Sequence, residues 1–328
     1  MPAVEFDKQV AIVTGAGGGI GAAIALELAR RGARVLINDV ADEGAASSAR
    51  AEATAREIRR AGGKAEVSAV PVGSFEAART IVEQARAAFG RVDMLANVAG
   101  TALPGEITAF DDAQIKAHFE TNLIGPYALA RAVWPIMRAQ RYGRILNTSS
   151  NAALGIGANA PYAATRAGML GLTLDAAVEG LEHGILVNAM MPAAYSRMIE
   201  RIPDIAYVAW FREHLPASKV AAVAAYLMSR TCRLTGRILA VGGGRVARVA
   251  FAEGRGWFDA QISAESVAEH IAEVTSMRAS RVLNSQPDAM RLLSQALPPA
   301  AGPAPALDRT TVIGAGHGAT SSDPEGNA

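Results

Sequence analysis

The sequence contains few cysteine, lysine and aromatic residues, and these shortages argue against several classes of protein. One cysteine, Cys232, stands among 328 residues, which excludes a disulfide framework and argues against a cysteine-based metal site. The chain has four lysines, so arginine supplies the other 28 of its 32 basic residues, and the net charge is only +1. Nothing electrostatic therefore points to nucleic acid or to an anionic membrane.

Long apolar runs and targeting features are also missing. No apolar stretch reaches the roughly 20 residues of a membrane span without a charge or a breaker. The first eight residues lack the basic start and apolar run of a signal peptide, and a single cysteine fits a reducing compartment. The five histidines lie far apart without acidic partners at ligand spacing. We expect a cytoplasmic protein with no membrane span and no metal site.

Half of the residues are hydrophobic, and they alternate between strand-like and helix-like patterns. Short β-branched runs predict strands at Gln9–Val13, Arg34–Asn38, Lys64–Val72, Met94–Asn97, Arg144–Thr148, Leu186–Met190 and Arg237–Val241. Helical spacing predicts helices at Gly21–Arg31, Asp42–Arg60, Phe75–Phe89, Asn122–Arg138, Ala160–Glu179 and Ser218–Ser229. This alternation predicts an α/β fold, a single doubly wound Rossmann domain with a parallel seven-stranded sheet.

The pattern changes along the last third of the chain. We expect the Rossmann domain to occupy residues 1–250, with an irregular, apolar substrate lid at about 193–217. Residues 251–296 are interpreted as a C-terminal helical extension, with a helix at Ser263–Met277. Residues 297–328 are rich in Pro, Ala, Gly, Ser and Thr, which predicts a disordered tail.

A glycine-rich turn follows the first strand and opens the first helix, which is the context that a dinucleotide-binding fingerprint requires. Glycines there permit positive φ angles and let the backbone approach a pyrophosphate, while free N–H groups face the anion. Glycine also serves ordinary turns, but the spacing and the flanking elements favour the nucleotide interpretation. The predicted cofactor-binding residues of this turn are Thr14, Gly15, Gly17, Gly19, Ile20 and Gly21.

Asp39 ends the second strand, eighteen residues after Gly21. A carboxylate there can accept hydrogen bonds from the adenosine ribose hydroxyls and would repel the 2′-phosphate of NADP. The alternative is a helix N-cap or a solvated loop acid. We therefore predict NAD as the cofactor.

Further motifs occur in the order found in the short-chain dehydrogenases/reductases, which the chain resembles from about Phe6 to Gly244. They are the glycine turn, Asn97-Val98-Ala99-Gly100, Asn122, Ser149-Ser150, Tyr162 and Pro192. The resemblance is strongest to the branch that contains (3R)-hydroxyacyl-CoA and 17β-hydroxysteroid dehydrogenases. The residues on which this resemblance rests are Ile37-Asn38-Asp39, Tyr142-Gly143-Arg144-Ile145, Pro192-Ala193-Ala194-Tyr195-Ser196-Arg197-Met198 and Val241-Gly242-Gly243-Gly244.

The resemblance implies a role for each matching residue. Tyr162 would be the acid/base, because hydride transfer at a carbinol carbon needs a proton transfer at its oxygen. Ser150 would hydrogen-bond the substrate oxygen, and Asn122 would support a water path for protons. Ser149 lies thirteen residues before Tyr162, the usual family spacing, whereas strand register favours Ser150, so the choice stays open. The remaining implied cofactor contacts are Val72, Gly73, Asn97, Ala99, Gly100, Pro192 and Ser196.

Arg166 is the sharpest departure from the family, which has lysine four residues after the tyrosine. The family lysine lowers the pKa of the tyrosine and binds the nicotinamide ribose. Arginine keeps the positive charge but spreads it over a larger planar group. Two interpretations follow: a working enzyme with an altered rate or pH optimum, which we favour, or an NAD-binding protein with weak or no turnover.

The expected function is NAD(H)-dependent interconversion of a hydrophobic secondary alcohol, such as a steroid or terpenoid, and its ketone. A 3-hydroxyacyl-CoA is the second candidate substrate, whose phosphates could meet Arg245, Arg248 and Arg255. An NAD-sensing regulator and a non-redox Rossmann enzyme are rivals from other classes. By resemblance we expect a homodimer or homotetramer, formed through the helices at Asn122–Arg138 and Ala160–Glu179.

Overall fold

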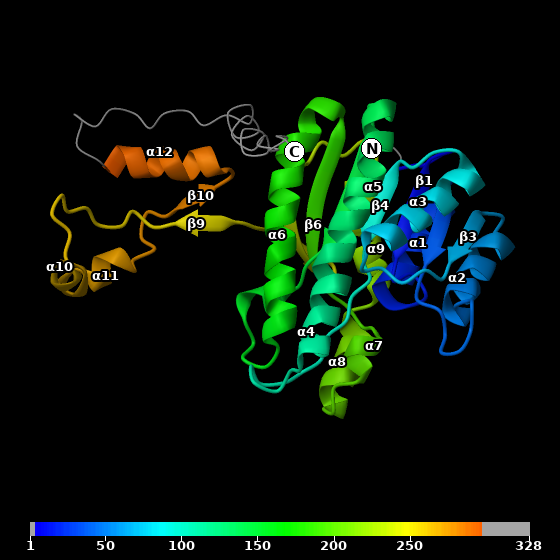
Figure 1. The fold of residues 1–328 in the computed structure, drawn as a ribbon, viewed down its shortest axis with the longest axis horizontal. Helices are drawn as coiled ribbons and strands as arrows, with labels where there is room; N and C mark the ends of the chain where they lie inside the picture. The colour runs from blue at the N-terminus through cyan, green and yellow to red at the C-terminus, as the bar shows by residue number, and fades with distance from the viewer. Residues whose placement is uncertain (1–3, 297–328) are drawn as a thin grey trace, which may run out of the picture. The chain divides into compact units, whose positions relative to one another are not determined.

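Seven parallel strands form most of one sheet in the computed structural model, which describes residues 4–296 (Figure 1). The spatial order is β3-β2-β1-β4-β5-β6-β7, followed by β8. The parallel strands are β1 (Val10–Thr14), β2 (Arg34–Asn38), β3 (Lys64–Ser68), β4 (Met94–Asn97), β5 (Gly143–Thr148), β6 (Ile185–Ala193) and β7 (Ile238–Gly242). The predicted α/β class and Rossmann-like parallel sheet are confirmed.

The prediction of seven strands is wrong, because β8 (Arg245–Val249) pairs antiparallel with β7 as an eighth strand. Gly243 and Gly244 connect the two strands with φ angles of +60° and +97°. Two consecutive positive φ angles are what a tight two-residue hairpin turn requires, and glycine adopts them without strain. This glycine pair was a hairpin signal that the sequence interpretation missed.

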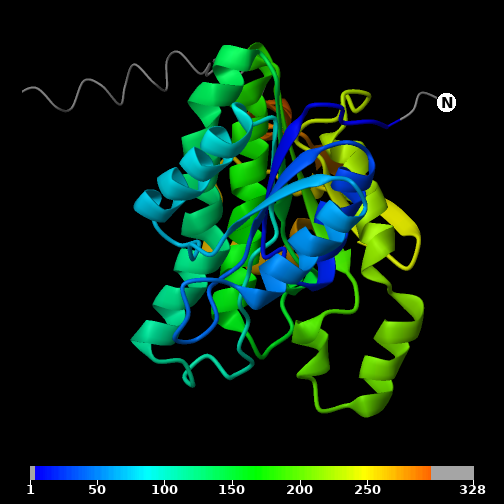
Figure 2. The same cartoon turned by 90° about the vertical axis from the view of Figure 1, so that its right-hand side faces the viewer.

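Helices cover both faces of the sheet, as the two views show (Figures 1 and 2). Both faces need a cover because alternate residues of each strand face opposite sides of the sheet, as strand β1 illustrates. Ile12 packs into a core with α3, α5 and α6, whereas Ala11 and Val13 pack into a second core with α1, α2 and α9. The helices are α1 (Gly19–Arg30), α2 (Ala49–Arg60), α3 (Phe75–Phe89), α5 (Gly125–Gln140), α6 (Ala160–Gly180) and α9 (Ala217–Met228).

The order of the strands reverses at β1, which lies between β2 and β4. The chain leaves β1 towards β2 and β3 on one side and later returns to β4 on the other. In open α/β sheets, ligands bind at the carboxyl ends of the strands where such a reversal opens a crevice. The fold therefore places a binding crevice beyond Thr14 and Asn97, the last residues of β1 and β4.

One continuous helical segment carries Asn122. It begins with α4 (Asp112–Phe119), passes through the π-helical turn η1 (Glu120–Ile124) and continues as α5. The sequence predicted a start at Asn122, but the capping box of Asp111 and Gln114 starts the segment ten residues earlier. Single π-helical turns inside α-helices are frequent at functional sites, and this one holds Asn122 fully buried.

The predicted irregular lid contains two short helices, α7 (Arg197–Glu200) and α8 (Ile205–His214), at the same end as the start of α4 (Figures 1 and 2). A polar contact ties the two helices together. The Arg212 guanidinium donates a hydrogen bond to the Tyr195 hydroxyl over 2.7 Å, and that hydroxyl donates to Glu200. The expectation of irregular structure was wrong because short caps, such as Asp204 at α8, start helices without long-range periodicity.

A second compact unit begins at Ala250. It contains a two-stranded antiparallel sheet of β9 (Phe251–Glu253) and β10 (Arg281–Leu283), with α10 (Ala264–Glu269), α11 (Ile271–Val274) and α12 (Gln286–Ala296). The helix predicted at residues 263–277 is therefore broken into α10 and α11. None of residues 250–296 is fully buried. The predicted disordered tail, 297–328, lies outside the described residues.

Within residues 4–296, every helix is too short or too polar to cross a lipid bilayer.

Candidate active site

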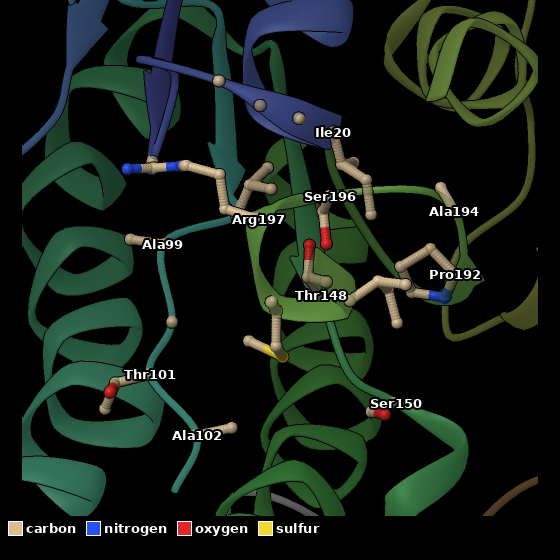
Figure 3. A pocket seen from close by; sticks show the side chains of 18 of the residues that line it. Ile20, Ala99, Thr101, Ala102, Thr148, Ser150, Pro192, Ala194, Ser196 and Arg197 are labelled. Atoms are coloured by element: carbon tan, nitrogen blue, oxygen red, sulfur yellow. The ribbon is translucent and has the colours of Figure 1, made fainter. Parts of the chain in front are cut away.

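A cavity of about 640 Å³ opens at the carboxyl ends of the central strands (Figure 3). Its volume lies within the roughly 300–1,000 Å³ typical of ligand pockets. The predicted site residues that line it are Gly15, Gly19, Ile20, Gly21, Asp39, Val72, Ala99, Gly100, Ser150, Tyr162, Arg166, Pro192 and Ser196. Five other predicted residues do not line it: Thr14, Gly17, Gly73, Asn97 and Asn122. The structure thus brings most of the predicted residues together.

The glycine turn forms one end of this cavity. Gly15 has a φ angle of +65°, and a Cβ there would lie only 2.8 Å from the Cα of Ala99, so a side chain would force β1 and β4 apart. The Thr14 hydroxyl accepts hydrogen bonds from the backbone N–H groups of Val98 and Ala99, over 3.0 and 3.1 Å. Thr14 does not line the cavity but fixes the loop after β4 against the glycine turn, and both of these segments line it.

Asp39 lies beside the turn and is nearly buried. Its Oδ2 accepts a hydrogen bond from the Gly17 N–H over 2.8 Å, which explains why Gly17 supports the site without lining it. Two guanidinium groups also face the carboxylate. The Nη2 of Arg50 lies 3.6 Å from Oδ1, and the Nη2 of Arg197 lies 4.0 Å from Oδ2. Asp39 is the one acidic residue among the described residues that line the cavity.

Tyr162 and Arg166 form the opposite part of the cavity wall, one turn apart on α6. The Arg166 guanidinium donates to the backbone oxygen of Thr148 over 2.7 Å and to the Asn122 Oδ1 over 3.2 Å. Its Cζ lies 4.9 Å from the centre of the Tyr162 ring. The charge is therefore held in a fixed place against the ring by two acceptors.

Gly100 provides the room that this guanidinium occupies. A Cβ built on Gly100 would collide with the Nη2 of Arg166. Because Gly100 has no side chain, the loop that contains it leaves space for Arg166, which is bulkier than the family lysine. The Arg166 Nε is buried and has no hydrogen-bond partner within residues 4–296.

The two candidate serines differ in their surroundings. The Ser149 hydroxyl is buried and donates to the backbone oxygen of Arg166 over 2.7 Å, so its proton is engaged within α6. Both serines line the cavity, but the half-buried Ser150 hydroxyl accepts from the Ala152 N–H over 3.1 Å, which leaves its own proton available to a ligand. This difference favours Ser150 as the group that meets a substrate.

Asn122 and Asn97 act on loops rather than on the cavity. The Asn122 side chain accepts from the Thr101 N–H and donates to the Thr101 carbonyl oxygen, both over 2.9 Å. The Asn97 amide donates to the Asn147 Oδ1 over 2.9 Å and thereby ties β4 to β5. Gly73 has a φ angle of +147° where the loop after β3 passes Glu120. These residues position the cavity wall.

Sequence reasoning gave no site role to several polar residues that line the cavity, among them Thr148, Arg50, Arg197 and Arg201. The Thr148 Oγ1 is buried without a hydrogen-bond partner in the described part of the chain. Figure 3 shows the hydroxyls of Thr148 and Ser196 pointing into the same space between them. For Thr148 and Arg197, the available signal was their position next to predicted residues in the sequence. Thr148 precedes the serine pair, and Arg197 follows Ser196.

The site has no cluster of metal-binding side chains. Among residues 4–296, no group of three or more His, Cys, Asp or Glu could hold an ion. Buried His118 accepts a hydrogen bond from the Leu103 N–H and contacts the Gln114 backbone oxygen through its other ring nitrogen, which is a structural role. Burial raises the pKa of the Cys232 thiol, which keeps it protonated and unreactive.

Comparisons with known proteins agree with this geometry. The short chain dehydrogenase family pattern matches residues 9–201. The peroxisomal multifunctional enzyme type 2 of Mus musculus is 38% identical over 253 residues, which are 75% of this chain and 33% of that protein. The chain thus spans a third of the length of this relative. The (2S)-[(R)-hydroxy(phenyl)methyl]succinyl-CoA dehydrogenase subunit of Thauera aromatica is 32% identical over 200 residues, 61% of this chain and 78% of that one.

A solved structure supports the same assignment. The 7α-hydroxysteroid dehydrogenase complexed with NADH and 7-oxo glycochenodeoxycholic acid superposes with a TM-score of 0.67 at 28% identity. The match covers 74% of this chain and 95% of that one. The fold, the cavity and the sequence match converge, and the chain belongs to the short-chain dehydrogenase family.

Proposed function

We propose that this short-chain dehydrogenase uses NAD(H) to interconvert a hydrophobic secondary alcohol, such as a steroid or terpenoid, and its ketone. One observation carries the proposal. A single cavity joins the glycine turn and Asp39 at one end to the Tyr162 and Ser150 hydroxyls at the other. Hydride and proton transfer can occur together only if both ends face one space.

The residues present fit a dinucleotide. The close approach of Gly15 to Ala99 leaves backbone rather than side chains around the turn, and the unpartnered Thr148 hydroxyl offers a polar group to a ligand. When bound, the nicotinamide supplies or accepts the hydride. Tyr162 then holds or releases the proton at the substrate oxygen, and Ser150 donates a hydrogen bond to that oxygen. The fixed Arg166 guanidinium places a positive charge against the Tyr162 ring, beside the group that exchanges the proton.

The preference for NAD over NADP rests on Asp39. Its carboxylate lies beside the turn where ribose hydroxyls would reach it, and a 2′-phosphate would be repelled there. The neighbouring guanidinium groups of Arg50 and Arg197 offset part of that repulsion. We therefore expect a preference for NAD that is moderate rather than absolute. The hydroxysteroid dehydrogenase that superposes on this chain was solved with NADH, which supports the same choice.

The substrate class rests on the other wall of the cavity. Met198, Ile199, Tyr207 and Phe211 from α7 and α8 line it, and apolar side chains favour a steroid-like or terpenoid alcohol. The superposing hydroxysteroid dehydrogenase holds a bile-acid ketone, which supports this choice.

A 3-hydroxyacyl-CoA remains the second candidate, because one relative is named as a (2S)-[(R)-hydroxy(phenyl)methyl]succinyl-CoA dehydrogenase subunit, and that name describes a hydroxylated coenzyme A thioester. Two of the three arginines suggested for its phosphates, Arg245 and Arg248, do not line the cavity. Arg245 and Arg248 lie on β8, where odd and even positions face opposite sides of the sheet, and Arg255 belongs to the second unit. Arg201, which does line the cavity, is the better-placed cation.

Replacing Arg166 by lysine tests whether the native chain is an effective enzyme. Native protein and Arg166→Lys are assayed with NAD and a panel of steroid, terpenoid and 3-hydroxyacyl-CoA alcohols, while NADH binding is followed by fluorescence. Turnover by the native chain is the expected result. If NADH binds but turnover occurs only in the lysine variant, the native chain is a cofactor-binding protein rather than a dehydrogenase.

We also propose that the chain forms a homodimer or homotetramer through α5 and α6. A hollow of about 340 Å³ lies between these helices, lined by Tyr127, Trp134 and four charged side chains. Tyr127 and Trp134 are partly exposed aromatic side chains in this hollow, and a second subunit that packs there would cover them. Sedimentation of the native protein and Trp134→Ala tests this. The cytoplasmic location stays a prediction.

A further inference from the structure

Arg197 is the first residue of α7, directly after Ser196, and its side chain turns back across the cavity. Its Nη2 lies 4.0 Å from the Asp39 Oδ2. A Cβ built on Gly18 would lie 3.6 Å from its Nε, so the guanidinium passes over the glycine turn. Figure 3 shows this side chain extending away from Ser196 along the turn, on the side of the pocket opposite Ser150.

The contacts of the charged residues around the cavity distinguish Arg197 from the others. Five charged side chains line the cavity: Asp39, Arg50, Arg166, Arg197 and Arg201. Arg166 is engaged by Thr148 and Asn122 at the far wall, and Arg50 faces both Asp39 and Asp42. Arg197 is the cation placed over the glycine turn. Its side chain is half exposed, and its contact with Asp39 is long, so solvent screens it and a competing anion can displace it.

We propose that Arg197 binds the pyrophosphate of the dinucleotide, and that its contact with Asp39 is the resting arrangement that the cofactor replaces. This inference rests on the proposed use of NAD(H). The adenosine ribose hydroxyls take the Asp39 carboxylate, and the guanidinium moves to the phosphate oxygens, which its planar donors match. Backbone N–H groups of the turn provide dipoles, and Arg197 provides the full positive charge that they lack.

The location of Arg197 gives this contact a second effect. Met198 and Ile199 follow it directly and line the apolar part of the cavity. Holding Arg197 on the pyrophosphate therefore fixes the start of α7 and, with it, part of the substrate wall.

Ligand fragments separate the pyrophosphate from the rest of the cofactor. NADH binding is measured by fluorescence, and adenosine, ADP-ribose, NAD and NADP are titrated as competitors against native protein, Arg197→Gln and the matched control Arg56→Gln, an exposed arginine of α2 that does not line the cavity. In Arg197→Gln we expect about tenfold or greater weakening for NADH, NAD and ADP-ribose, the loss expected for one charged hydrogen-bonding partner. Adenosine affinity should be unchanged or slightly tighter, because a competitor for Asp39 has been removed. Arg56→Gln should leave the affinities for NADH and for all four competitors within about twofold of native.

Three results would overturn the inference. ADP-ribose affinity that is unchanged in Arg197→Gln would show that the pyrophosphate does not meet this residue. Weakening confined to NADP would place Arg197 at a ribose phosphate instead. A native chain that binds neither NADH nor ADP-ribose would overturn the proposed function as well, and so is distinguishable from the first two. Arg197→Lys, which keeps the charge without the planar fork, should fall between native and Arg197→Gln, and unchanged melting temperatures would exclude misfolding.

Discussion

The two ends of the cavity differ in how far their polar groups are already engaged. Around the glycine turn the contacts are long or carried by backbone, as between Arg197 and Asp39 at 4.0 Å. At the Tyr162 end, Arg166 is buried, makes hydrogen bonds of 2.7 and 3.2 Å and packs against the ring. One end is thus open to exchange partners with a ligand, and the other is fixed before any ligand arrives.

This difference separates binding from chemistry. The cofactor end depends on features common to the whole family, and changes there should alter affinity by moderate factors. The chemical end depends on the arrangement that Arg166 imposes, and changes there should alter turnover by larger factors while cofactor affinity stays nearly constant. Four experiments test whether the two ends are as independent as this comparison implies.

Tyr162→Phe should have the largest effect. It removes the hydroxyl that exchanges a proton with the substrate, and general acid–base groups contribute about 10²–10⁴-fold to rate. Turnover should fall by that factor, whereas NADH affinity should change by less than about threefold. Steady-state kinetics and NADH fluorescence measure the two quantities. A loss of NADH affinity as large as the loss of turnover would show that the two ends are not independent.

The next largest effect is expected at the serine pair, where substitution of the two residues should have different consequences. Ser150→Ala should lower turnover about 10²–10³-fold, as expected when a donor to the developing oxyanion is removed. Ser149→Ala instead removes a buried hydrogen bond to the Arg166 carbonyl oxygen and should lower the free energy of unfolding by about 1–3 kcal/mol. Chemical denaturation and kinetics on both variants distinguish them. The opposite pattern would assign the substrate contact to Ser149.

Gly100→Ala tests the room that Arg166 needs. The new methyl group collides with the guanidinium and should displace it, with a loss of turnover of up to about 10²-fold, as expected for misplaced catalytic groups. Gly171→Ala on α6 is the matched control, because nothing lies within 4 Å of its Cβ position. Adding Arg166→Lys to Gly100→Ala should restore part of the activity. Equal activity of Gly100→Ala and native protein would mean that the position of Arg166 does not matter.

Asp39→Asn should have the smallest effect. Removing the charge weakens ribose binding and ends the repulsion of a 2′-phosphate, so the ratio of NAD to NADP affinity should fall about tenfold. Asp42→Asn is the control, since Asp42 also faces Arg50 but does not line the cavity. Competitive titration of both cofactors gives the ratios. An unchanged ratio in Asp39→Asn would remove the basis for predicting NAD.

The central part of the fold was predictable because local patterns and the architecture agree. β1 and β2 carry continuous apolar runs between turns, as strands buried on both faces must. The lid was less predictable, since α7 and α8 are four and ten residues long and give too few periods for a helical pattern to be recognised. β8 was missed because Gly243 and Gly244 were assigned to a family motif rather than to a turn.

The site was predictable where a residue's position in the chain fixes its position in space. Gly15 and Asp39 directly follow the adjacent strands β1 and β2, so their proximity follows from the sheet. Arg197 lies far from Asp39 in sequence, and its reach across the turn depends on how the chain leaves β6 and enters α7, which no local pattern records. The room beside Gly100 is likewise a property of packing between two loops and a helix.

The hairpin at Gly243–Gly244 has a consequence for solubility. Without β8, the backbone N–H and C=O groups along the outer side of β7 would stand unpaired, two strands away from β5, which carries Thr148. Unpaired strand edges are templates for aggregation, and charged side chains on an edge oppose it. β8 covers β7 and becomes the outer strand itself, with exposed Arg245 and Arg248 along it. The hairpin thus replaces an apolar edge by a charged one and protects the catalytic sheet from pairing with another chain.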